Sequence, residues 1–213
     1  MGKNLIAMSL PELRFTDHLY QLIKKKHRAC YLKALALLHS IEVKAIVEIG
    51  VFKGKNARML RELFPEAHLY LVDPWSPDFS YLSQGGPVAA QREVYTKAFS
   101  NVKTMFKNDL RTTIIRKPSN AAAPDIPNDI DLIFIDANHD YSCVKQNIIT
   151  YLPKLRSRSI LAGHNYGHQR LPGVKQAVDE IFGSNCYLGQ DFVWAYLADH
   201  QRSHRRGLEP PTT

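Results

Sequence analysis

Few cysteines and no long apolar run characterise this sequence. Its three cysteines, Cys30, Cys143 and Cys186, lie too far apart for the paired spacing of a zinc site or a dense disulfide framework. We therefore expect buried free thiols in a reducing cytoplasm. No apolar run reaches the roughly 18 residues that a membrane-spanning helix needs, and the first residues lack the charged-then-apolar order of a signal peptide. The sequence thus predicts a cytoplasmic protein that has no contact with a membrane.

The composition indicates one globular domain. Hydrophobic residues make up 45% of the 213 residues and charged residues 23%, which is usual for a soluble protein with one well-buried core. We divide the chain into an N-terminal helical cap (1–40), a main domain (41–200) and a basic tail (201–213). We expect the tail to be mobile because it contains little apolar surface to bury.

The formal net charge of +8 raises the question of nucleic-acid binding. The charge is spread along the chain, and the one dense basic run covers residues 24–28. Apolar residues on both sides of this run recur at helical spacing, so we interpret it as the solvated face of a helix rather than as a phosphate-binding patch. We therefore consider nucleic acid an unlikely partner. The sequence is compatible with a homo-oligomer.

Helix and strand patterns alternate along the chain. The predicted strands cover residues 45–49, 68–72, 112–116, 130–135 and 159–162, with a closing hairpin of 186–188 and 192–197. The predicted helices cover residues 16–40, 55–64, 88–107, 141–151 and 174–182, and a turn is predicted around Ser119 and Asn120. This alternation predicts an α/β fold with a doubly wound, mostly parallel seven-stranded sheet and an antiparallel C-terminal hairpin.

The most informative segment is the apolar run at 130–135, which ends in Asp136 and is followed by His139. A buried parallel strand has this pattern, and open α/β sheets bind ligands beyond the carboxyl ends of their strands. Asp136 and His139 are therefore candidate site residues. The alternative is that Asp136 caps the next helix and His139 is a solvated loop residue.

A glycine turn and an acidic residue point to a cofactor. Gly50 directly follows the first strand and Gly54 stands at the entrance of the next helix, while the second strand ends in Asp73. Glycines allow close approach of backbone amides to a ligand, and an acidic residue at this place can accept hydrogen bonds from both ribose hydroxyls. Because the G-x-G-x-x-G fingerprint is missing, a nucleoside cofactor without a pyrophosphate fits best.

With these residues, the chain resembles the class I S-adenosylmethionine-dependent methyltransferases, which share a Rossmann-like fold. Four stretches, within residues 41–197, resemble the small O-methyltransferases, including the macrocin-type sugar O-methyltransferases. They are Val47-Glu-Ile-Gly50-Val-Phe-Lys-Gly54, Ile135-Asp-Ala-Asn-His139-Asp-Tyr141, Leu161-Ala-Gly-His164-Asn165-Tyr166 and Gly173-Val-Lys-Gln-Ala-Val-Asp179. The resemblance implies Glu48 and Gly50 near the methionine moiety of the cofactor, Asp73 on its ribose and Ser119 and Asn120 near its adenine. Gly54 and Asp136 complete the predicted cofactor site.

The resemblance also implies a divalent metal, usually magnesium, held by Asp136 and by the residue pair that ends the fifth strand. That pair is His164 and Asn165, whereas relatives have at least one carboxylate there. Magnesium prefers hard oxygen ligands, so one carboxylate and one amide would bind it weakly, and a histidine favours a softer transition metal. The sequence leaves the metal open.

We predict a methyltransferase that acts on a hydroxyl of a small molecule. His139 is the candidate general base, since histidine can accept a proton at neutral pH, and Asp136 would orient it or bind a metal. The loop 75–87 and the first helix are the expected lid and acceptor wall. A nucleic-acid methyltransferase is the first alternative, but amino-directed members have an Asn/Asp-Pro-Pro-Tyr/Phe element where this chain has Asp136-Ala-Asn-His139. A catalytically silent cofactor-binding or interaction module is the second.

Overall fold

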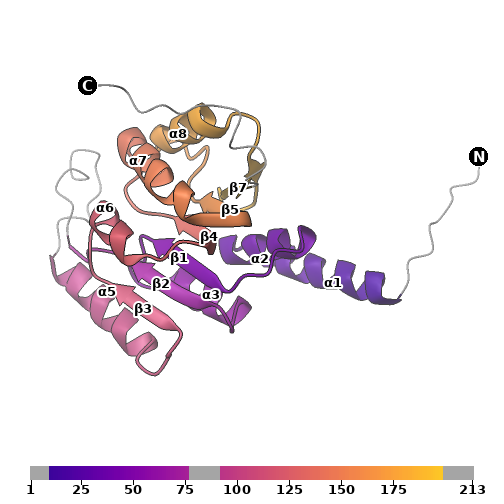
Figure 1. Cartoon of the computed structure of the whole chain (residues 1–213), viewed down its shortest axis with the longest axis horizontal. Helices are drawn as coiled ribbons and strands as arrows, with labels where there is room; N and C mark the ends of the chain where they lie inside the picture. The colour runs from indigo at the N-terminus through magenta and orange to yellow at the C-terminus, as the bar shows by residue number, and fades with distance from the viewer. Residues whose placement is uncertain (1–9, 77–91, 199–213) are drawn as a thin grey trace, which may run out of the picture.

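The computed structural model describes residues 10–76 and 92–198 (Figure 1). The strands are β1 (Ala45–Ile49), β2 (His68–Val72), β3 (Thr112–Ile115), β4 (Ile130–Ile135), β5 (Leu155–Gly163), β6 (Tyr187–Leu188) and β7 (Trp194–Ala198). The helices are α1 (Leu10–Lys24), α2 (Arg28–Leu38), α3 (Lys55–Leu63), α5 (Arg92–Met105), α6 (Ser119–Ala122), α7 (Tyr141–Tyr151) and α8 (Pro172–Phe182). Two short 3-10 turns cover Ala123–Asp125 and Leu152–Lys154.

Within these residues, seven strands form one sheet in the order β3-β2-β1-β4-β5-β7-β6. β1 to β5 pair in parallel, and β7 is antiparallel to both β5 and β6. All residues of β4 are buried, as expected for the central strand of a sheet that is covered on both faces. The predicted fold class, with its antiparallel C-terminal hairpin, is confirmed.

Two hydrophobic clusters cover the two faces of the sheet. Apolar side chains of α2, α3 and α5 pack on one face, among them Leu32, Leu60 and Val102. Side chains of α7 and α8, such as Ile148 and Val178, pack on the other. The segments that follow β1, β2 and β4 meet at the carboxyl ends of these parallel strands.

The prediction of one helix over residues 16–40 is wrong, because two helices occupy this part of the chain. Lys26 has φ 50°, in the left-handed region that ends an α-helix, and the His27 side chain accepts a hydrogen bond from the Ala29 backbone amide to begin α2. The basic run therefore marks a break between helices rather than a continuous helix face. α1 extends away from the sheet, whereas α2 lies beside it (Figure 1).

Three smaller expectations differ from the structure or lie outside its described residues. Ser119 and Asn120 begin the short helix α6 instead of forming a simple turn. None of the three cysteines forms a disulfide, but only Cys30 is buried, while Cys143 and Cys186 are partly exposed. The predicted mobile tail and most of the predicted lid loop lie outside the described residues.

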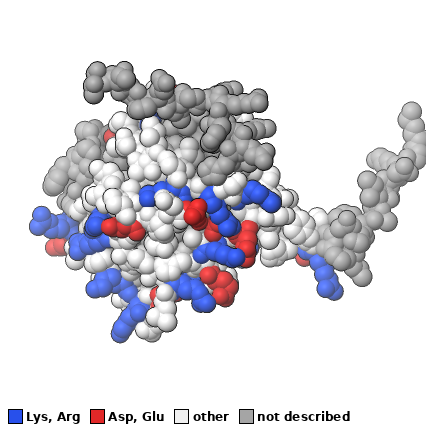
Figure 2. Space-filling model, in the orientation of Figure 1, with Lys and Arg blue, Asp and Glu red and all other residues white. Residues whose placement is uncertain are grey.

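None of the helices in the described ranges combines the length and apolar composition that crossing a membrane requires. On the face shown in Figure 2, basic and acidic side chains are interspersed rather than segregated into one basic surface.

Candidate active site

The predicted site residues meet where β1, β2 and β4 end. The Gly50 amide donates a hydrogen bond to the Val72 carbonyl (2.8 Å), and the Asp136 amide donates to the Ile49 carbonyl (2.7 Å), so the three strand ends are tied together. A cavity of about 920 Å³ opens at this edge of the sheet. Its lining includes Gly50, Asp73, Ser119, Asn120, Asp136 and His139, with Phe52, Tyr95, Asn138, Ser142, Cys143 and Gln146 among the other residues.

Asp73 is buried and organises the glycine turn. One carboxylate oxygen accepts hydrogen bonds from the amides of Val51 and Phe52 (both 2.9 Å), and the other accepts from the amide of Trp75 (2.6 Å). Burial raises the pKa of the Asp73 carboxyl, and these three hydrogen bonds oppose the rise. A carboxylate offers about four acceptor positions, so Asp73 can accept a further hydrogen bond from a ligand in the cavity.

Gly50 lies so close to the loop after β4 that a side chain does not fit. Its φ is +91°, and a Cβ atom there would stand 2.1 Å from the Asp136 carbonyl oxygen and 2.8 Å from the Ala137 Cα. Both contacts are with backbone, which cannot move aside without disturbing the strand end. The glycine requirement predicted from the sequence thus has a specific cause at Gly50.

Glu48 is fully buried beneath the site. One of its carboxylate oxygens accepts a hydrogen bond from the Asn56 side chain (3.2 Å). Burial raises the pKa of Glu48 to about 8, against the hydrogen bond from Asn56, which lowers it. Glu48 is therefore largely protonated at neutral pH in the absence of a cationic ligand.

The raised pKa of Glu48 predicts a pH-dependent stability. A carboxyl whose pKa is higher in the folded than in the unfolded state stabilises the fold at low pH, and this stabilisation is lost as the pH rises through the folded-state pKa of about 8. We expect the unfolding free energy of the wild type to fall between about pH 5 and pH 9, relative to Glu48→Gln, by on the order of 4 kcal/mol. Urea unfolding across this range measures the difference, with Glu62→Gln on the surface of α3 as the control. Parallel curves for wild type and Glu48→Gln would contradict the assignment.

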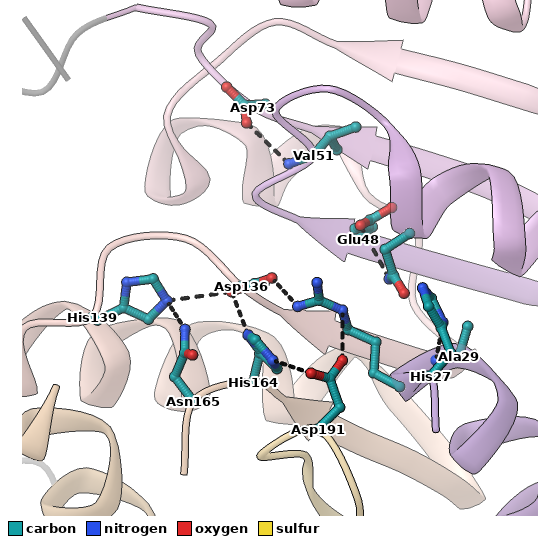
Figure 3. Close-up of polar contacts among 12 residues, drawn as sticks. His27, Ala29, Glu48, Val51, Asp73, Asp136, His139, His164, Asn165 and Asp191 are labelled. Carbon is teal, nitrogen blue, oxygen red and sulfur yellow. Dashed lines mark hydrogen bonds and ion pairs between the residues drawn. The ribbon is translucent and has the colours of Figure 1, made fainter. Parts of the chain in front are cut away.

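Asp136 is the centre of a polar cluster that we call the Asp136 cluster: Arg28, Asp136, His139, His164, Asn165 and Asp191 (Figure 3). The Arg28 guanidinium donates to one Asp136 oxygen at 2.8 Å. The other oxygen lies 3.3 Å from His139 Nε2 and 3.5 Å from His164 Nδ1. Burial alone would raise the pKa of Asp136, but the hydrogen bonds with the two histidines and the charge of Arg28 together hold it below its ordinary value.

The remaining members complete the Asp136 cluster. His139 Nε2 also contacts the side-chain nitrogen of Asn165 at 2.6 Å. Asp191, in the turn before β7, lies 3.6 Å from both Arg28 Nε and His164 Nε2. The sequence did not indicate a role for Arg28 or Asp191, because each becomes relevant only through contacts far along the chain.

The predicted metal ligands do not fit a divalent cation. One Asp136 oxygen is hydrogen-bonded to Arg28 at 2.8 Å, and a guanidinium so placed repels a second cation. His164 contributes an imidazole where a hard metal needs a carboxylate. Among the described residues, no group of three or more His, Cys, Asp or Glu side chains is arranged to hold a metal ion.

The structure brings some predicted residues into the cavity and leaves others outside it. Glu48, Gly54, His164 and Asn165 do not belong to the described cavity lining. Gly54 caps the start of α3 with φ 74°, and a Cβ atom there would stand 3.0 Å from Val102 Cγ2, so its requirement for glycine is a matter of helix geometry. His164 contacts Asp136, and Asn165 contacts His139, so both lie directly behind residues that line the cavity.

Comparison with known proteins agrees with this geometry. A family model described as a methyltransferase domain matches residues 47–166. No curated protein sequence matches the chain significantly.

Similar solved structures include several methyltransferases. The O-methyltransferase NovP is 12% identical, with 87% of this chain and 79% of NovP covered and a TM-score of 0.59. The calicheamicin methyltransferase CalS11 is 18% identical, with 92% and 97% covered and a TM-score of 0.56. The SAH-bound methyltransferase PaMTH1 of Podospora anserina is 16% identical, with 93% and 100% covered and a TM-score of 0.52. At these identities the likeness establishes the shared fold.

Proposed function

The chain belongs to this methyltransferase domain family, and on that premise we propose that it transfers a methyl group from S-adenosylmethionine to a hydroxyl of a small molecule. The observation that carries the proposal is one cavity in which the Gly50 turn and Asp73 face the same space as Asp136 and His139. A donor site and a proton-accepting group thus share one cavity, as methyl transfer to a hydroxyl requires.

The cavity suits a nucleoside with a charged side chain. Its volume of about 920 Å³ is within the range of about 300–1,000 Å³ that is typical of small-molecule sites. The Gly50 turn allows close approach of a ligand, Asp73 has capacity to accept from a ribose hydroxyl, and Ser119 and Asn120 line the part of the cavity that we assign to the adenine. The SAH-bound form of PaMTH1, which shares the fold, supports the same choice of methyl donor.

The chemistry is a single displacement. The acceptor oxygen forms a bond to the methyl carbon while the carbon–sulfur bond breaks, its electron pair stays on sulfur to give S-adenosylhomocysteine, and the hydroxyl proton passes to the protein. We assign this proton to His139, whose partly exposed side chain lines the cavity. Asn165 and Asp136 both contact Nε2 of this imidazole, and the Asp136 carboxylate stabilises the imidazolium that forms.

Two observations favour a small molecule as the acceptor. NovP, which shares the fold, is an O-methyltransferase, and CalS11 is a calicheamicin methyltransferase. The interspersed charges on the face shown in Figure 2 lack the continuous basic surface that tracks a nucleic-acid backbone. We also propose the division into a helical cap (1–40), a methyltransferase domain (41–200) and a tail (201–213).

The proposed function is tested by incubating the protein with methyl-labelled S-adenosylmethionine and a panel of hydroxyl-bearing sugars, phenols and catechols, with RNA and DNA as further acceptors. Label on a small-molecule hydroxyl supports the proposal. Label on nucleic acid would replace it with the alternative enzyme class, and cofactor binding without transfer to any acceptor would favour a silent binding module.

Asp73→Ala is expected to weaken S-adenosylmethionine binding at least tenfold. The change removes the acceptor that holds the amides of Val51, Phe52 and Trp75, and it removes a hydrogen bond to the ribose, worth about 1.5–3 kcal/mol. Titration calorimetry measures the affinity. Asp109→Ala is the matched control, because Asp109 also accepts a backbone amide but precedes β3, at the opposite edge of the sheet. Equal cofactor affinity in wild type and Asp73→Ala would refute this assignment.

A further inference from the structure

We propose that the Arg28 guanidinium takes the place of a divalent cation at Asp136, so that this enzyme transfers methyl groups without a metal. The inference rests on the proposed function and deepens it. Arg28 is a positioning residue. It contacts Asp136, and through Asp136 it acts on His139, to which we assign the proton of the acceptor.

The arrangement is a closed ring of four side chains. Two carboxylates, Asp136 and Asp191, alternate with the guanidinium of Arg28 and the imidazole of His164 (Figure 3). The contacts around the ring are 2.8 Å from Arg28 to Asp136, 3.5 Å from Asp136 to His164, 3.6 Å from His164 to Asp191 and 3.6 Å from Asp191 to Arg28. The guanidinium thus occupies the space between two carboxylates, which is where a shared metal ion would otherwise be attracted.

The fold holds Arg28 rigidly beside Asp136. Arg28 is the first residue of α2, whose start is fixed by the hydrogen bond from the Ala29 amide to His27. Ala29 and Leu32 are fully buried against the sheet, so the helix cannot withdraw without exposing core. A guanidinium retains its charge at every physiological pH and holds carboxylates with directed hydrogen bonds.

A comparison within the chain distinguishes Arg28 from a structural arginine. Arg61 forms an equally shielded ion pair with Asp109, at 2.7 Å, but it also donates to the backbone carbonyls of four residues and thereby joins two loops. Arg28 instead contacts two carboxylates, one of which lines the cavity. The contacts of Arg28 therefore neutralise the negative charge of these carboxylates at the site.

The histidine that follows β5 fits the same interpretation. A hard metal at this position needs oxygen donors, but His164 places an imidazole between the two carboxylates, with Nδ1 3.5 Å from Asp136 and Nε2 3.6 Å from Asp191. Removing Arg28 would leave two carboxylates and an imidazole around a space without a cation. Two carboxylates are donors that suit Mn²⁺.

The decisive experiment is titration of the full chain with MnCl₂ by calorimetry. We expect no saturable binding by the wild type, and one Mn²⁺ bound at least tenfold more tightly by Arg28→Ala. Arg28→Lys keeps the positive charge and is expected to stay metal-free. Arg58→Ala is the matched control, since it unmasks the Glu62 carboxylate on the exposed surface of α3. Adding Asp191→Asn to Arg28→Ala is expected to weaken Mn²⁺ binding again.

Activity gives an independent readout. Chelator is expected to leave wild-type turnover unchanged, while Arg28→Ala is expected to lose turnover, keep its affinity for S-adenosylmethionine within about twofold and recover turnover when Mn²⁺ is added. A purely structural role would not produce rescue by a metal.

Two results would overturn the proposal: saturable Mn²⁺ or Mg²⁺ binding by the wild type that disappears in Asp136→Asn, or a folded Arg28→Ala, verified by circular dichroism, that binds no metal. Both are measured without an acceptor. Failure of the proposed function would appear separately, as cofactor binding without methylation.

Discussion

Replacing His139 with alanine is expected to lower the rate of methyl transfer by about 10²- to 10⁴-fold, the usual contribution of a general base. His139 lines the cavity and is held between Asp136 and Asn165, so its loss removes the group to which we assign the hydroxyl proton. The affinity for S-adenosylmethionine is expected to change little, because the donor side of the cavity is formed by the loops after β1 and β2. Single-turnover kinetics with saturating donor separates the two quantities.

The control for His139 is His68→Ala. His68 begins β2 at the amino-terminal edge of the sheet and contacts Thr113, so its removal tests the general cost of losing a half-buried histidine. We expect full turnover from this control. If His139→Ala transfers methyl groups as fast as the wild type to the true acceptor, another group takes the proton and the assignment is wrong.

The parts of the fold that follow from local pattern were predicted well. The alternation of helix and strand indicated the parallel sheet, and the sheet order confirms the fold class. The apolar run of β4 and the carboxylate after it indicated that the site lies at the carboxyl ends of the strands. The position of the site follows from the fold. Parallel strands end side by side, so Gly50, Asp73 and Asp136 had to be neighbours.

The parts that depend on distant contacts were not predictable. Arg28 belongs to a basic run that looks like a solvated helix face, and only the break at Lys26 and the packing of α2 bring it to Asp136, 108 residues away. Asp191 likewise lies in a turn with no local signal. One hint was His164, whose imidazole departs from the carboxylate that the resemblance implies at a metal site.

For Asp73, the sequence predicted that the residue belongs to the site but did not predict its hydrogen bonds with the backbone. The sequence indicated a ribose ligand, whereas in the fold the carboxylate also accepts hydrogen bonds from the amides of Val51, Phe52 and Trp75. Such hydrogen bonds depend on the path of the loop, which no residue pattern specifies. They mean that a change at Asp73 affects the shape of the donor site as well as one of its ligands.

Gly50→Ala is expected to abolish detectable binding of S-adenosylmethionine and to lower the unfolding free energy by on the order of 3 kcal/mol. Alanine at φ +91° is strained, and its Cβ would stand 2.1 Å from the Asp136 carbonyl oxygen. Either the turn after β1 or the loop after β4 must move. A shift of the turn displaces the Val51 and Phe52 amides from Asp73, and a shift of the loop displaces Asp136 and, with it, His139. Calorimetry measures the cofactor affinity, and urea unfolding measures the stability.

Gly167→Ala separates the clash at Gly50 from left-handed strain alone. Gly167 has φ +75°, a positive angle like that of Gly50, but a Cβ atom there would meet nothing within 4 Å. Its replacement is therefore expected to cost only the backbone strain, about 1–2 kcal/mol, and to leave cofactor affinity unchanged. The excess loss in Gly50→Ala then measures the contact between the turn after β1 and the loop after β4. Binding of S-adenosylmethionine by Gly50→Ala within about threefold of wild type would show that these two loops can separate without disturbing the donor site, and the proposed placement of the cofactor against Gly50 would have to be abandoned.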